Sequence, residues 1–356
     1  MTASTVPGAK PARASAPGRI CLAGEGLDWM VGGRSVVAAI DLRTTVSFVP
    51  AADGASIELV SGEPLSVRRS ILRVDAGRYA GDVLDLLQAA AYRVLRRAPG
   101  HVSGIVHVSS ALPVGVGLSS SAALALATCA ALSDALGFPV DRRQVCSDAF
   151  LAENHELGTG SGWMDFLGCA YGRVSVVSAA AVPSCESLRD DLDAVIVIAV
   201  TGERRSLRET LAALRARLDV GDPDLLVYIT ETQNIVNELS LELRKPIVSF
   251  ENVGDLIGEA HSLLRDRLRC SSPLIDRAVR ACTSAGAYAA KQMGDRGTAL
   301  FAICPGSLTT DVLTALRHLD MKGKVVGVDT NGLISMDMSS ESPLTRPGRA
   351  WRSLPT

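Results

Sequence analysis

The sequence lacks any strong excess of charge. Its 356 residues include 36 lysine and arginine residues and 38 aspartate and glutamate residues, so the formal net charge is −2. Without a global positive field, neither nucleic acid nor an anionic membrane surface is expected as a partner. Any anion that the protein binds must therefore be held by a local arrangement of groups.

Several other signals are missing. The eight cysteines include no C-x-x-C pair and lie mostly in apolar segments, which is typical of reduced core cysteines and favours a cytoplasmic protein. The five histidines are dispersed and H-E-x-x-H is absent, so a zinc or iron centre is not expected. No basic segment followed by an apolar segment opens the chain, and residues 1–15 are interpreted as a disordered leader instead of a secretion signal.

An uncharged run extends from Val108 to Ser133. It is long enough to cross a membrane, because a span needs about 20 mainly apolar residues. Pro113, Gly115, Gly117 and three consecutive serines interrupt the run near its middle. We therefore interpret it as the end of a strand, a loop and an Ala- and Leu-rich helix, and we expect no membrane span.

Strand and helix signals are mixed along the chain and do not alternate regularly, which favours an α+β fold over a doubly wound parallel sheet. Long helical segments dominate from Leu207 onward, whereas β-branched segments are frequent before it. We expect a leader at residues 1–15, an N-terminal domain at 16–185, a C-terminal domain at 186–338 and a tail at 339–356. The Asn331-Gly332 pair predicts a hairpin over residues 325–336.

The Gly- and Ser-rich segment from Gly115 to Ser121 could hold a phosphate group. A glycine-rich loop that opens a helix presents unpaired backbone N–H groups at the positive end of the helix dipole. Serines in the first turn add hydroxyl donors and can ligate a divalent metal. No lysine follows the last glycine, so this is not a Walker A loop. A helix start with serine caps and an Ala-rich packing face has the same composition, and both interpretations stay open at this point.

Two further stretches contain acidic residues in informative places. Glu25 and Asp28 follow Gly24 in an expected turn after a strand, where they could bond substrate hydroxyls or simply cap the turn. Asp165 is flanked by large apolar residues, a setting in which an unpaired carboxylate is costly. It therefore has either a chemical role or a structural partner, such as a helix N-terminus or an arginine.

Together these stretches resemble the signatures of the GHMP kinase superfamily, the small-molecule kinases named for galactokinase, homoserine kinase, mevalonate kinase and phosphomevalonate kinase. Pro113-Val-Gly-Val-Gly-Leu-Ser-Ser-Ser-Ala122 is similar to the phosphate-binding motif of that family. Ala16-Pro-Gly-Arg19, Gly24-Glu25-x-x-Asp28 and Met164-Asp165 resemble motifs of its galactokinase branch. With a further likeness over residues 263–305, the resemblance spans most of residues 16–305.

The resemblance implies a fold, two cofactors and a set of roles. The implied fold has an N-terminal domain like domain 2 of ribosomal protein S5 and a ferredoxin-like C-terminal domain, with the active site between them. The implied cofactors are ATP and Mg²⁺. Phosphate binding is implied for Pro113, Gly115, Gly117, Leu118, Ser119, Ser120 and Ser121.

The resemblance also implies which residues bind Mg²⁺, act as the general base and bind the acceptor. Ser121 and Glu153 are implied to hold Mg²⁺. Asp165 is implied to be the general base that takes the proton of the attacking hydroxyl, with Arg19 beside it favouring its charged form. Glu25 and Asp28, together with Asp165, are implied to bind sugar hydroxyls.

The departures from the family pattern concern specificity. Residues 293–299 replace a glycine-rich loop and introduce Arg296, while Gly26 and Trp29 stand where the galactokinase motif has His and Tyr. We therefore expect phosphorylation of the anomeric C1 hydroxyl of a modified or non-galactose sugar. Two alternatives stay open: a kinase acting on a non-sugar alcohol, and an inactive sensor of sugar or nucleotide. Arg204 and Arg205 are interpreted as a solvated pair at a helix start; with an acidic sugar as substrate, they and Arg296 would be the candidates for binding it. No signal for an oligomeric state is present.

Overall fold

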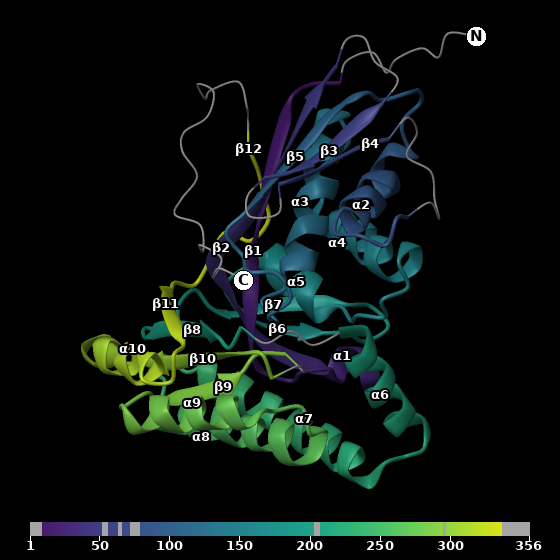
Figure 1. Cartoon of the computed structure of the whole chain (residues 1–356). Helices are drawn as coiled ribbons and strands as arrows, with labels where there is room; N and C mark the ends of the chain where they lie inside the picture. The colour runs from purple at the N-terminus through teal and green to yellow at the C-terminus, as the bar shows by residue number, and fades with distance from the viewer. Residues whose placement is uncertain are drawn as a thin grey trace.

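The computed structural model describes residues 9–51, 56–62, 66–71, 79–202, 207–294 and 297–336 (Figure 1). Its helices are α1 (Leu27–Val31), α2 (Asp85–Leu95), α3 (Ser120–Ala135), α4 (Arg142–Leu151), the π-helical turn η1 (Ala152–Glu156), α5 (Met164–Tyr171), α6 (Leu207–Asp219), α7 (Pro223–Leu243), α8 (Phe250–Leu263), η2 (Leu264–Leu268), α9 (Pro273–Ser284), η3 (Gly306–Leu308) and α10 (Thr309–Arg317). Its strands are β1 (Ala12–Ala23), β2 (Arg34–Pro50), β3 (Ile57–Ser61), β4 (Val67–Ile71), β5 (Gly104–Ser110), β6 (Val174–Ser178), β7 (Ser184–Arg189), β8 (Val195–Val200), β9 (Ala289–Gln292), β10 (Ala299–Cys304), β11 (Lys322–Val326) and β12 (Ile334–Met336).

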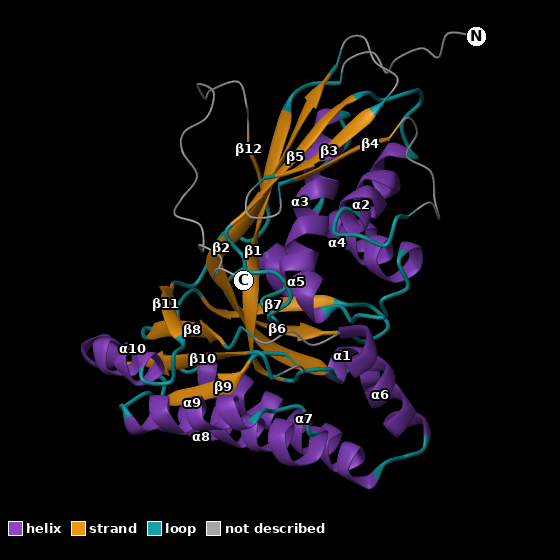
Figure 2. Cartoon of the chain, viewed as in Figure 1, coloured by secondary structure: helices purple, strands orange, loops and turns teal. Residues whose placement is uncertain are grey.

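The larger sheet belongs mainly to the first half of the chain. Within the described residues it has eight strands in the order β12-β1-β2-β5-β3-β4, and β6 and β7 extend it from β2. β2 is 17 residues long, so its two ends pair with different strands, β6 and β5. Helices α3 and α5 pack on β1 and β2, and α2 and α4 lie against α3 (Figure 2). The Ala- and Leu-rich part of the uncharged run becomes α3, and almost all of its Ala and Leu side chains are buried in this layer.

The smaller sheet forms from the second half of the chain. Its order is β11-β8-β10-β9, with antiparallel pairs throughout. One face packs against α9 and α10. The other face contributes Ile196, Ile198 and Phe301 to a hydrophobic core that continues into the first half of the chain. The two halves therefore share one apolar interior.

The predicted α+β class is confirmed, but the predicted leader is too long. β1 begins at Ala12, so residues 12–15 form strand and not disordered chain. β1 lies between β2 and β12, and Ala12 and Ala14 are buried in the hydrophobic core. Residues 1–8 and the predicted tail at 339–356 lie outside the described part of the chain. Among the described residues, no helix has both the length and the apolarity needed to cross a membrane.

The predicted hairpin over residues 325–336 is wrong. β11 belongs to the smaller sheet, whereas β12 pairs with β1 in the larger one. The turn between them is fixed by Asp329, whose carboxylate accepts the N–H groups of Asn331 and Gly332 and forms an ion pair with Arg43 of β2. These bonds direct the chain back to the first half.

The strand pairing also moves the predicted domain boundary. β7 pairs with β6 and therefore lies in the larger sheet, although the boundary at residue 185 would cut through it. We propose that the division falls in residues 190–194, between β7 and β8. The C-terminal domain then ends before β12.

Candidate active site

A cavity of about 250 Å³ collects most of the residues singled out in the sequence. Its lining comes from β1 and α1, the loop before α3, η1, α5, α6 and the loop after β9. The predicted residues that line it are Arg19, Glu25, Asp28, Gly115, Gly117, Ser119, Ser120, Ser121, Glu153 and Asp165. Pro113 and Leu118 do not line it; the Leu118 side chain is buried in the core, and its carbonyl accepts the N–H of Arg19.

The Gly- and Ser-rich loop forms one wall of this cavity. Gly117 has a φ of +82°, and a Cβ there would lie 2.9 Å from the carbonyl oxygen of Met293. Ser119 adopts a left-handed conformation at the N-cap of α3 and makes no side-chain capping bond. The first turn of α3 thus keeps backbone N–H groups for a ligand, and the hydroxyls of Ser120 and Ser121 lie beside them at the cavity.

The predicted base and its arginine lie side by side. The Arg19 Nε donates to the Asp165 carboxylate at 3.0 Å, and its Nη2 forms a closer ion pair with the same oxygen. Arg19 also donates to the carbonyl of Gly117 at 2.5 Å, so it contacts both the carboxylate and the phosphate-side loop. The Arg19 side chain is 4% exposed and that of Asp165 is 27% exposed, which leaves the carboxylate accessible from the cavity.

The Gly-rich surroundings of Asp28 predicted an open turn, but Asp28 lies in the short helix α1. Its carboxylate accepts the N–H groups of Trp29 and Met164, both at 2.9 Å. Burial raises the pKa of Asp28 to about 6, against the lowering effect of these two hydrogen bonds. Because Met164 immediately precedes Asp165, Asp28 ties α1 to the start of the helix that carries the predicted base.

Glu25 is held in a way that the sequence did not indicate. Its carboxylate forms a buried ion pair with Lys291 of β9, and both side chains are at most 3% exposed. Its backbone carbonyl accepts the hydroxyl proton of Tyr228 from α7 at 2.7 Å. Glu25 still lines the cavity, so its predicted contact with a sugar hydroxyl stays a prediction. Sequence reasoning missed Lys291 and Tyr228; the signal for Lys291 is a lysine that directly follows the uncharged segment Ala287 to Ala290.

Glu153 and Ser121 face each other in the cavity beside the Gly- and Ser-rich loop. Glu153 belongs to η1, a π-helical turn that continues α4, and such turns are frequent at functional sites. Burial, and then the charge of Asp165, raises the pKa of Glu153 to about 7, while a hydrogen bond with Ser121 opposes the shift. No cluster of three or more His, Cys, Asp or Glu side chains able to hold a metal occurs in the part of the chain that the structure describes. One carboxylate and one hydroxyl next to the predicted phosphate-binding loop suit Mg²⁺, which prefers to share its ligands with phosphate oxygens and water.

The raised pKa of Glu153 predicts a pH-dependent requirement for Mg²⁺. A metal ion must displace the proton of this carboxyl group, so its apparent affinity falls as the pH drops below about 7. Between pH 8 and pH 6 we expect the half-saturating Mg²⁺ concentration to rise about tenfold. Titrations of Mg²⁺ in a steady-state assay measure this rise, and Glu153→Gln should abolish it. A pH-independent Mg²⁺ requirement in the unaltered protein would contradict the assignment of Glu153.

The raised pKa of Glu153 also affects stability: Mg²⁺ affinity should rise with pH, whereas the stability of the metal-free fold should fall. Between pH 4.5 and 7 the folded, metal-free protein keeps a proton on Glu153 that the unfolded chain releases. Its free energy of unfolding should therefore fall as the pH rises through this window.

An apolar pocket of about 180 Å³ adjoins the cavity. It shares Val114, Ser120 and Ser121 with the cavity lining. Its remaining walls come from β2, β3, β5, α3 and the start of α2, and include Leu84, Leu87, Val108 and Leu124. The apolar pocket and the cavity meet at the Gly- and Ser-rich loop, and the Asp165 carboxylate lines the cavity.

The structure describes part of residues 293–299, the segment that replaces the glycine-rich loop of the family pattern. Gly294 lines the cavity, and the backbone of residues 293–294 lies against Gly117. Arg296 lies outside the described residues, as do Arg204 and Arg205, so the interpretations placed on them stay predictions.

The comparisons with known proteins agree with this geometry. Residues 85–173 match the GHMP kinases N terminal domain and residues 243–318 match the GHMP kinases C terminal domain. A mevalonate kinase of Thermococcus gammatolerans is 30% identical, over 90% of this chain and 97% of its own length. A galactokinase of Mycobacterium tuberculosis is 27% identical over 85% of this chain and 92% of its own. The structure of a Methanococcus jannaschii mevalonate kinase superposes with a TM-score of 0.74 at 18% identity, covering 89% of this chain and 98% of that one.

Fold and relatives define the class of protein: a small-molecule kinase that transfers phosphate from ATP to an alcohol group. The chain belongs to the GHMP kinases, and its two-domain α+β fold is the fold of that family, as predicted. GHMP kinases use ATP with Mg²⁺. The galactokinase branch is not singled out, because mevalonate kinases match at slightly higher identity.

Proposed function

We propose that this GHMP kinase phosphorylates a neutral, polyhydroxylated acceptor, with the anomeric C1 hydroxyl of a modified or non-galactose sugar as the first candidate. The observation that carries the proposal is the Arg19–Asp165 pair, which faces the Gly- and Ser-rich loop within one cavity. Phosphoryl transfer depends mainly on positioning and on charge neutralisation, and this arrangement offers both.

Each part of the site has a role in this proposal. The backbone N–H groups at the start of α3 bind the phosphates of ATP, and the adjoining apolar pocket receives the nucleobase of ATP. Ser121 and Glu153 hold Mg²⁺, which neutralises charge on the phosphates. Asp165 takes the proton of the acceptor hydroxyl, while Arg19 holds this carboxylate in place.

The charge of the cavity favours a neutral acceptor. Among the described residues that line it, Arg19 is the only cation, and it is already paired with Asp165. Three further acidic side chains line the same space; Glu25 is paired with the buried Lys291, which leaves Asp28 and Glu153 as additional acidic groups. A carboxylate on the acceptor would approach these groups at a cost, whereas hydroxyl groups would find acceptors for their protons.

The relatives favour a second candidate, a non-sugar alcohol such as mevalonate. The mevalonate kinase of Thermococcus gammatolerans matches over nearly its whole length. Near the rim of the cavity, Arg215 of α6 donates to the carbonyl of Gly160 and lies over the ring of Trp29, 5.4 Å from its centre. The guanidinium of Arg215 is therefore the described group that an acceptor carboxylate would use.

The deciding experiment is an acceptor panel. The full chain, ATP and Mg²⁺ are incubated with neutral sugars, amino sugars, uronic acids, homoserine and mevalonate, and ADP release is followed. Turnover of a sugar, with phosphorus NMR placing the phosphate on C1, supports the first candidate. Turnover of mevalonate alone replaces it with the second. Nucleotide and sugar binding by calorimetry without ADP release would instead identify an inactive sensor.

A further inference from the structure

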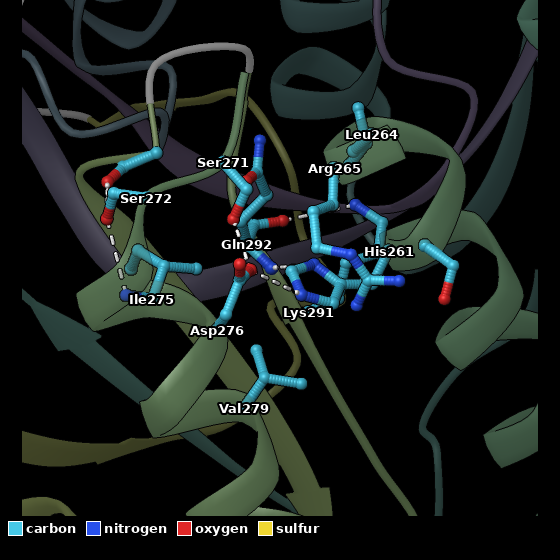
Figure 3. A network of polar contacts seen from close by, with 12 residues as sticks. His261, Leu264, Arg265, Ser271, Ser272, Ile275, Asp276, Val279, Lys291 and Gln292 are labelled. Atoms are coloured by element: carbon cyan, nitrogen blue, oxygen red, sulfur yellow. Dashed lines mark hydrogen bonds and ion pairs between the residues drawn. The ribbon is translucent and has the colours of Figure 1, made fainter. Parts of the chain in front are cut away.

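Strand β9 of the second half contacts the active site of the first half through two adjacent buried side chains. Lys291 and Gln292 are both 0% exposed. Figure 3 shows them beside His261 and Asp276, in a polar network enclosed by α8, η2 and α9. Polar groups so deeply buried are costly unless they have partners, so the partners of these two indicate what the strand holds.

Lys291 points toward Glu25, at the acceptor end of the cavity, which is defined here by Glu25 and Asp28. Its ammonium donates to the carbonyl of Cys21 at 3.0 Å and forms the ion pair with Glu25. His261 lies in the same network but carries no positive charge at neutral pH, because burial, and then the positive charge of Lys291, lowers its pKa to about 4. Its Nε2 lies 3.4 Å from the carboxylate of Asp276. Glu25 is thus the anionic partner of Lys291.

The residues fixed by this pair lead directly to the acceptor end of the cavity. Glu25 precedes α1, which begins two residues later and contains Asp28. Tyr228 holds the backbone of Glu25 from a second element of the C-terminal half. Asp28 in turn bonds the N–H of Met164, next to Asp165. A continuous set of contacts therefore joins β9 and α7 to the predicted base.

Gln292 is directed to the phosphate side. Its amide nitrogen donates to the carbonyl of Gly294 at 3.0 Å and also contacts the sulfur of Cys270 at 3.1 Å. Gly294 lies against Gly117 of the phosphate-side loop, with the Gly117 Cβ position 3.3 Å from the Gly294 nitrogen. Two neighbouring residues of one strand thus support two different parts of the cavity lining, the segment with Glu25 and the loop with Gly294.

We propose that Lys291 is a positioning residue: through Glu25 it holds α1 and the acceptor end of the cavity, separately from the nucleotide end that Gln292 supports. This inference rests on the proposed function insofar as α1 contributes to acceptor binding. It goes beyond that function because it assigns control of the acceptor end to the C-terminal half of the chain.

The test replaces the two adjacent residues by the same side chain. Lys291→Met should raise the acceptor KM about tenfold or more and leave the affinity for a non-hydrolysable ATP analogue within about twofold. Gln292→Met should show the reverse pattern. Both side chains are buried in one strand, so a merely structural role would change the two constants together in both variants. Such parallel changes would overturn the proposal.

A milder variant and a second measurement keep the test decisive. Tyr228→Phe removes only the hydroxyl that holds the Glu25 carbonyl, so it should fold and should raise the acceptor KM alone, by about threefold to tenfold. Hydrogen exchange gives a readout that needs no acceptor: Lys291→Met, or Tyr228→Phe if Lys291→Met does not fold, should speed exchange in residues 24–31 and not in residues 113–121. Unchanged exchange in residues 24–31 would refute the positioning role. If no acceptor is turned over by the unaltered protein, the proposed function fails while the exchange result still decides this inference.

Discussion

The Asp165→Asn variant is expected to bind ATP normally and to turn over its acceptor about 10²- to 10⁴-fold more slowly than the unaltered kinase. The amide keeps the shape of the carboxylate and can still accept a hydrogen bond from Arg19, but it cannot take a proton from the acceptor hydroxyl. The loss should therefore appear in kcat. Steady-state kinetics, with nucleotide affinity measured separately by calorimetry, separates these two effects.

Asp190→Asn is the matched control. The Asp190 side chain is 71% exposed, and it forms a surface ion pair with Arg173 away from the cavity. Its replacement should leave kcat unchanged, because surface pairs contribute little. A kcat for Asp165→Asn within about threefold of the unaltered kinase would remove Asp165 from the role of general base.

Gly117→Ala should weaken ATP binding by at least about fivefold. The added methyl group would lie 2.9 Å from the carbonyl oxygen of Met293, and 3.0 Å from its carbon, so one of the two loops must move. Because the Gly117 carbonyl also accepts from Arg19, the movement would reach the pair with Asp165. Overpacking of this kind costs about 1–3 kcal/mol, which corresponds to roughly a fivefold to 160-fold loss of affinity.

Gly137→Ala is the control that separates the steric contact with Met293 from backbone strain. Gly137 has a φ of +72° and nothing within 4 Å of its Cβ position, so alanine there has the same left-handed conformation without the contact. We expect about 1–2 kcal/mol of lost stability from strain in both variants, measured by urea unfolding, and a loss of ATP affinity for Gly117→Ala alone. Equal nucleotide affinities in the two variants would show that the contact with Met293 has no importance for binding.

Local patterns predicted the parts of the fold that depend on nearby residues. The Ala and Leu run from residue 120 predicted α3, because a helix buried on nearly all sides needs no polar face. In contrast, α1 has only five residues and lies between Gly26 and Gly32, both with positive φ. So short a helix has no periodic signal, and its acidic residue was assigned to a turn.

Pairing between distant segments could not be predicted in the same way. The Asn331-Gly332 signal is local, whereas the bonds of Asp329 to its own turn and to Arg43 redirect β12 to the larger sheet. Residues 12–15 are small and carry no strand pattern, and they are strand because β2 and β12 flank them.

The candidate site shows the same division. The residue types alone left both functional and structural interpretations open for the Gly- and Ser-rich loop and for Asp165, and the resemblance to a family added Arg19 as the partner of this carboxylate. The structure brings the three stretches into one cavity. The resemblance to a family supplied their roles, which stay predictions. The partners of Glu25 were missed because Lys291 and Tyr228 lie more than 200 residues further along the chain.

The pairing of β12 with β1 has a consequence for biosynthesis. Residues 334–336 supply the outermost strand beside β1, so that strand edge stays open while the ribosome is still adding the intervening 300 or so residues. Folding of the first half cannot be completed as each residue emerges. It ends only after translation has passed through the entire second half, and an open edge of this kind is a surface on which molecular chaperones act.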